Sequence, residues 1–80
     1  MIVYYKQALT TGASNSLDGI DGAVLGGDEM AFVCVSGNYY TYILDLDSAA
    51  EESSPDVIKP NTNYGDKRWI LQAPISPTPA

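Results

Sequence analysis

The stretch MAFVCVSGNYYTYILDL, residues 30–46, decides the fold. Two runs of β-branched and aromatic residues flank Gly37-Asn38, a dipeptide suited to a two-residue hairpin turn of type I′ or II′. Such a turn would place Val35 opposite Tyr40. The stretch therefore predicts a β-hairpin at the centre of the molecule.

Side chains alternate between the two faces of a hairpin, and here both faces are largely apolar. One face carries Ala31, Val33, Val35, Tyr40, Tyr42, Leu44 and Leu46, and the other carries Met30, Phe32, Cys34, Tyr39, Thr41 and Ile43. A hairpin with one face in water should instead alternate apolar and polar residues. Both faces therefore need a cover. The rest of this chain can cover one of them, and the other is covered either by the same chain or by another subunit.

Short β-prone runs lie on either side of the hairpin. Residues 2–5 favour a strand, and residues 67–72 favour another that carries Trp69, the expected anchor of the core. Residues 17–25 space their apolar side chains like a turn of helix, but two glycines among them make a long helix costly. We expect turns there, with a short 3-10 segment.

These elements predict an all-β fold in a single domain over residues 1–72. We expect a small sandwich or a partly open barrel around the central 30–46 hairpin, with at most one or two short helical turns. Residues 73–80 contain three prolines and cannot form a central strand. We expect them to form an extended, Pro-rich tail.

The composition of the 80 residues excludes much chemistry, because there is no histidine and only one cysteine. An intramolecular disulfide, a Ser-His-Asp triad, a Cys-His pair and the common zinc sites are excluded within one chain. We expect that the chain is not an enzyme and that it binds no cofactor and no metal. We interpret Cys34 as a small buried hydrophobic residue. A core of this size contributes only about 3–5 kcal/mol, so assembly with other chains is an expected source of stability.

The net charge of −6 argues against nucleic acid and against an anionic membrane as ligand. We find no signal peptide and no apolar run long enough to cross a membrane, and we expect synthesis in a host cytoplasm. Asp45 and Asp47, and the Asp-Gly pairs at 18–19 and 21–22, lack the spacing of calcium loops. We interpret these carboxylates as turn and strand-end residues.

An ordered series of motifs runs through the chain. It comprises LDGIDG at 17–22, Gly27-Asp28, YILD at 42–45, ESSP at 52–55 followed by Val57-Ile58 and Pro60, and GDKRWIL at 65–71. Over roughly residues 17–72 this series resembles a small β module that recurs in bacteriophage and prophage structural proteins, often within tail-fibre-like or other virion-surface chains. The GDKRW stretch is its most specific part. The resemblance implies no catalytic residues.

We therefore expect a non-enzymatic virion structural protein, either an accessory or decoration subunit or a fibre adaptor, that assembles on a capsid or tail. The expected partners are copies of itself, in a homo-oligomer, and the major capsid or tail protein. The candidate interface residues are Phe32, Val33, Val35, Tyr39, Tyr40 and Tyr42. Two alternatives stay open: a carbohydrate-binding module for host recognition, and an acidic soluble inhibitor that mimics nucleic acid.

Overall fold

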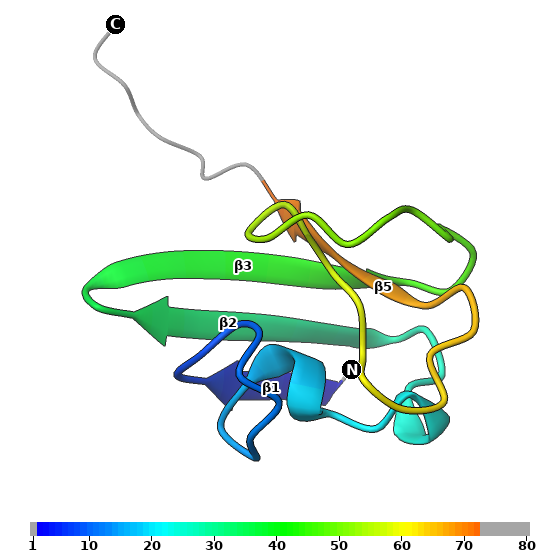
Figure 1. Cartoon of the computed structure of the whole chain (residues 1–80), viewed down its shortest axis with the longest axis horizontal. Helices are drawn as coiled ribbons and strands as arrows, with labels where there is room; N and C mark the ends of the chain where they lie inside the picture. Colours follow the sequence, from blue (N-terminus) through cyan, green and yellow to red (C-terminus); the bar gives the residue numbers. More distant parts are fainter. Residues whose placement is uncertain (1, 73–80) are drawn as a thin grey trace, which may run out of the picture.

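The computed structural model describes residues 2–72, and all strands in this range belong to one five-stranded sheet. The strands are β1 (Ile2–Lys6), β2 (Glu29–Val35), β3 (Asn38–Asp45), β4 (Val57–Ile58) and β5 (Arg68–Gln72), in the order β1-β2-β3-β5-β4 across the sheet (Figure 1). Two 3-10 turns, η1 (Leu17–Gly19) and η2 (Gly22–Val24), are the only helical segments within residues 2–72. The all-β class, the central hairpin and the two short helical turns are confirmed.

The strands of the described range form one sheet, so the two-sheet sandwich that we considered is not the architecture of this range. Loops and 3-10 turns, rather than a second sheet, provide the second layer. The expected Pro-rich tail, residues 73–80, lies outside the described residues.

The β2–β3 hairpin turns one residue earlier than the sequence predicts. Val35 pairs with Asn38, so the central residues of the turn are Ser36 and Gly37. Their φ angles are 50° and 83°, and positive φ at both central positions is what a type I′ turn requires. The register consequently differs from the prediction by two residues. A shift of two leaves every side chain on its predicted face.

β1 runs parallel to β2, so the chain must return over one face of the sheet before β2 begins. Residues 7–28 make this crossing over one face, which we call the inner face, and place Leu17 and Leu25 in the core (Figure 1). β5 pairs with the other side of β3. The hairpin is therefore flanked on both sides, and the edges of the sheet are β1 and β4.

The inner face holds the core. Its buried residues are Leu17, Ile20, Leu25, Ala31, Val33, Tyr42, Leu44, Ile58 and Trp69. Trp69 is fully buried, as expected of a core anchor, and Tyr4 packs edge-on against it with 6.1 Å between ring centroids. The indole N–H of Trp69 has no hydrogen-bond acceptor among the described residues. Packing must therefore offset a desolvation cost of about 1–3 kcal/mol.

Close backbone contacts at Gly22 join the two loop segments that cover the inner face. The Gly22 N–H donates to Thr62 O at 2.9 Å, and Lys67 Nζ donates to Gly22 O at 2.6 Å. A Cβ atom at this position would lie 2.2 Å from the backbone oxygen of Asn63. Only glycine fits between these loops, which gives the second Asp-Gly pair of the sequence a packing role.

Replacing Gly22 with alanine should therefore push the two loops apart. We expect Gly22→Ala to lower the free energy of unfolding by about 2–3 kcal/mol, as overpacking of a tight site does. Gly26→Ala is the matched control, because the nearest atom to its added Cβ is 4.0 Å away, and it should change stability by less than about 1 kcal/mol. Urea denaturation measures both, and equal losses would contradict the packing role.

Candidate functional site

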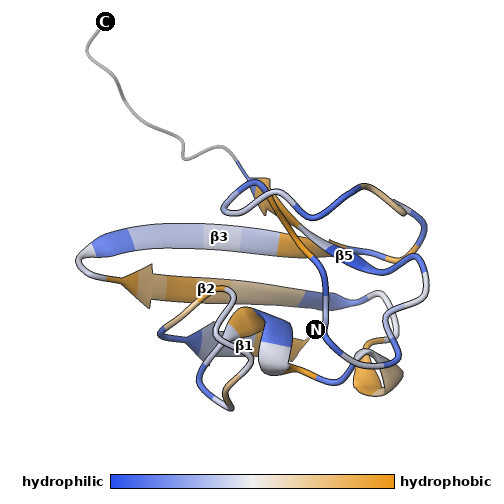
Figure 2. Ribbon diagram, in the orientation of Figure 1, coloured by the Kyte–Doolittle hydropathy of each residue, from blue (hydrophilic) through white to orange (hydrophobic). Residues whose placement is uncertain are grey.

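The face of the sheet opposite the core is apolar and open, and we call it the outer face. The strand registers place on it Val3, Tyr5, Met30, Phe32, Cys34, Tyr39, Thr41, Ile43, Val57, Ile70 and Gln72. The exposed fraction is 81% for Tyr39, 75% for Tyr5, 48% for Ile43 and 40% for Phe32. Hydrophobic colour accordingly runs almost unbroken along β2 in Figure 2 instead of alternating. Contiguous exposure of large apolar side chains marks an interaction site more often than scattered exposure does.

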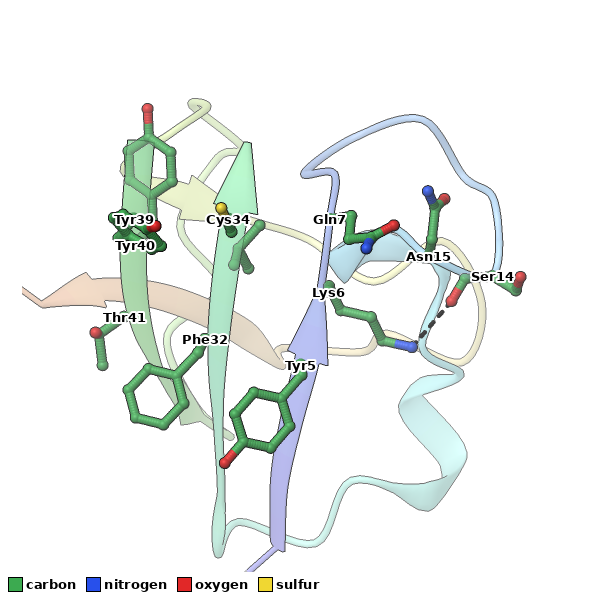
Figure 3. Close-up of a pocket in the computed structure, with 11 residues that line it drawn as sticks. Tyr5, Lys6, Gln7, Ser14, Asn15, Phe32, Cys34, Tyr39, Tyr40 and Thr41 are labelled. Carbon is green, nitrogen blue, oxygen red and sulfur yellow. Dashed lines mark hydrogen bonds between the residues drawn. The ribbon is translucent and has the colours of Figure 1, made fainter. Parts of the chain in front are cut away.

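A hollow of about 520 Å³ lies at one end of the outer face, across β1, β2 and β3 (Figure 3). Tyr5 and Phe32, on neighbouring strands, stack with 5.7 Å between centroids and 28° between ring planes. Cys34 and Tyr39 line the side of the hollow opposite Gln7 and Asn15 in Figure 3. The Tyr5–Phe32 pair comes from the parallel β1–β2 register, which sets these two residues opposite each other.

Polar side chains from the end of β1 and from the following loop form the remaining wall of the hollow. Lys6 Nζ donates to Ser14 O at 2.9 Å, which ties this loop to the strand. Gln7 and Asn15 also line the hollow, and their side-chain amides make no hydrogen bond to other described residues. The site therefore combines aromatic surfaces with a few free hydrogen-bonding groups.

This arrangement is suited to binding by stacking and burial. The described residues bring no general acid and base together at the hollow, where Lys6 is the one charged residue and is held by a carbonyl. Within residues 2–72, no group of three or more cysteine, aspartate or glutamate side chains is placed to hold a metal ion.

The carboxylates of the Asp-Gly pairs serve turns. Asp18 is buried, and one of its oxygens accepts from Gly12 N–H at 2.9 Å and from Ser16 Oγ at 2.6 Å. Asp21 caps η2 by accepting from Ala23 N–H at 2.9 Å, and this bond is the main cause that lowers the pKa of Asp21. These contacts agree with the interpretation of both residues as turn formers.

The six interface candidates from the sequence divide between the two faces. Phe32 and Tyr39 lie on the outer face. Val33 and Tyr42 are fully buried in the core, and we withdraw both as interface residues. Val35 and Tyr40 are partly buried against the core and are withdrawn as well, although Tyr40 reaches the rim of the hollow. The division follows from strand parity, since the covered face is the one that carries Ala31.

Sequence reasoning missed two features of the outer face. Tyr5 joins it through a parallel pairing between segments far apart in the chain, which no local pattern reveals. The sequence predicts a buried Cys34, but its side chain is exposed, because residues 7–28 cover the opposite face. The alternation of the hairpin gave the right partition of residues, without indicating which of the two apolar faces is covered.

In comparisons with known proteins, no family model, curated protein or solved structure matches the chain. Among the described residues, no helix has the length and hydrophobicity to cross a membrane. The site must therefore be interpreted from its own geometry.

The burial of Tyr42 leads to a prediction about how the stability of the fold depends on pH. Burial, followed by the charges of Tyr40 and Asp56, raises the pKa of Tyr42 to about 12, and its hydroxyl donates to Pro55 O at 2.6 Å. In the unfolded chain the Tyr42 hydroxyl loses its proton near pH 10, whereas in the folded state it keeps the proton to about pH 12. The free energy of unfolding should therefore fall as the pH rises from about 10 through 12.

Tyr42→Phe should remove this fall in the free energy of unfolding at alkaline pH. At neutral pH the variant should be about 1 kcal/mol less stable, because the hydrogen bond to Pro55 O is missing. Difference titration of phenolate absorbance should assign the late-ionising group to Tyr42. Tyr39→Phe is the control, since Tyr39 is 81% exposed and has no such partner. If both variants keep the late titration, our assignment of it is wrong.

Proposed function

We propose that this chain is a non-enzymatic structural subunit of a bacteriophage particle that acts by assembly, and that the outer face is its docking surface. The observation that carries the proposal is the open row of Tyr5, Phe32, Tyr39 and Ile43 on the sheet. The partners would be a capsid or tail protein or further copies of this chain, and the chain would reside in the virion.

The chemistry of the outer face supports assembly rather than catalysis. Its exposed large residues are aromatic or aliphatic, and aromatic side chains are enriched among the residues that contribute most to protein interfaces. A chain of this size has a small core of its own, so burial of the outer face against a partner would add stability that the free subunit lacks. A partner that supplied a complementary apolar surface would cover the outer face and add a layer opposite the loops of the inner face.

The sequence series from LDGIDG to GDKRWIL supports the particle assignment by resemblance. In the structure the basic residues of GDKRW contact backbone carbonyls. Arg68 is buried and donates from Nε to Ala50 O at 2.6 Å, and Lys67 Nζ donates to Gly22 O. The motif thus stabilises the loops around β5, and such a framework would recur wherever the same module is used as a building block.

The first test is quantitative mass spectrometry of gradient-purified particles from the source culture. We expect the chain to co-sediment with a major capsid protein. A ratio near one to one or one to a few would support a decoration or lattice subunit, and a very low ratio would support a fibre or tail component. Complete absence from the particles would overturn the particle assignment.

The second test places a charge on the outer face. Phe32→Asp should reduce incorporation into particles at least about tenfold, because an interface core of this kind excludes an unpaired charge. Val24→Asp is the control, because Val24 is also an exposed apolar residue, 59% accessible against 40% for Phe32, but lies in η2, away from the outer face. Circular dichroism checks that both variants fold. Normal incorporation of a folded Phe32→Asp chain would rule out the outer face as the docking surface.

A further inference from the structure

The sheet has one long edge, which β1 forms (Figure 1). The opposite edge, β4, is two residues long, whereas β1 has five. Strand edges expose backbone groups that can pair with another chain, and proteins usually protect them with proline, a bulge or charged side chains. β1 contains no proline, its pairing with β2 is unbroken, and its one charged residue, Lys6, is held by Ser14 O. The sequence of β1 therefore leaves this edge open to a further strand.

Every second residue of β1 directs its backbone groups toward the open edge. Ile2 N–H donates to Asp28 O at 3.1 Å. With the parallel register, this bond assigns the backbone groups of alternate residues, beginning with Ile2, to β2. The N–H and C=O groups of Val3 and Tyr5 therefore point away from β2. They make no hydrogen bond to another residue of the range 2–72, so they are available to a further strand.

The loop that follows β1 limits the length of the open edge. Gln7 N–H donates to Asn15 O at 2.8 Å, so this loop occupies the edge from Gln7 onward. Within the described chain, the open stretch is residues 2–6. Two copies of β1 that meet antiparallel about Tyr4 use this whole stretch on both sides. Val3 then lies opposite Tyr5 of the second copy, and each such pair exchanges two N–H···O bonds.

The side chains of β1 suit this register. Val3 and Tyr5 belong to the outer face, so each valine packs beside a tyrosine there and the outer faces of the two copies join. On the inner face Ile2, which is 52% exposed, lies opposite the aliphatic part of Lys6. No like charges are set opposite each other. The carboxylates of the chain begin at Asp18, so the segment that contains β1 adds no negative charge to the contact.

We propose that two copies of this chain associate through their β1 edges, antiparallel about a two-fold axis at Tyr4, so that their two five-stranded sheets form one continuous sheet. A two-fold contact must be self-complementary, and the matching of Val3 with Tyr5 provides this. The ladder is short compared with a standard protein interface, so the dimer should dissociate on dilution. The inference concerns the edge of the sheet rather than its outer face, and it does not rest on the particle assignment.

Hydrogen exchange in the unaltered full chain tests the pairing without any variant. At high chain concentration the amides of Val3 and Tyr5 should be protected, and dilution should speed their exchange at least about tenfold. The amides of Tyr4 and Lys6 bond to β2, so they should be protected already in the single copy. This alternation along one strand is specific to a ladder. Exchange at Val3 and Tyr5 that does not depend on chain concentration would overturn the proposal.

The matching variant is Val3→Pro, which removes an N–H that the single copy leaves unpaired, so the chain should still fold. Sedimentation velocity should show a dimer dissociation constant at least about tenfold higher, because each copy loses one bond and gains a ring at the contact. Val3→Ala is the matched control, since it keeps the N–H and should keep the dimer. Circular dichroism checks that both variants fold.

Phe32→Asp should also keep the dimer, because Phe32 lies on β2 and not at the edge. This variant therefore separates the edge contact from the outer face, whatever its effect on incorporation into particles. A folded Val3→Pro chain that dimerises like the unaltered chain would overturn the edge assignment. A dimer that is lost in Phe32→Asp and kept in Val3→Pro would show that the copies meet through their outer faces instead.

Discussion

The parallel pairing of β1 with β2 is the constraint on which the rest of the structure depends. Parallel neighbours cannot be joined by a tight turn, so residues 7–28 must pass over one face of the sheet. That passage determines which face is buried. It carries Leu17 and Leu25 onto the face that already holds Trp69. Among the described residues, no segment covers the other face, and its large apolar side chains stay exposed.

The covering layer has no regular secondary structure beyond two 3-10 turns, so it depends on backbone contacts between loops. Asp18 O accepts from Asn61 N–H and Thr62 O accepts from Gly22 N–H, which joins the first loop segment to the one before β5. These contacts need close approach of two backbones, and glycine at position 22 permits it. The Asp-Gly turns and the Gly-Asp-Lys-Arg-Trp stretch, distant in sequence, thus form one structural unit around the tryptophan.

Strand parity could be predicted from the sequence, and the pairing of distant segments could not. Alternation along residues 30–46 partitioned the hairpin correctly, even though the turn lies at Ser36 and Gly37, because a shift of two residues preserves parity. However, when both faces of a hairpin are apolar, the alternation of side chains cannot tell which face is buried. The choice between them depends on which face residues 7–28 pass over as they connect β1 to β2, and no local pattern specifies it. For that reason the sequence groups Tyr42 with Phe32 and Tyr39 as interface candidates, whereas the structure buries Tyr42 and exposes the other two.

An open apolar face of this kind favours association with other apolar surfaces. The net charge of −6 keeps free chains apart, but it does not remove the tendency of Tyr5, Phe32 and Ile43 to associate. Under the proposed function, the aromatic residues of the outer face would therefore determine both the self-association of free chains and their affinity for a partner.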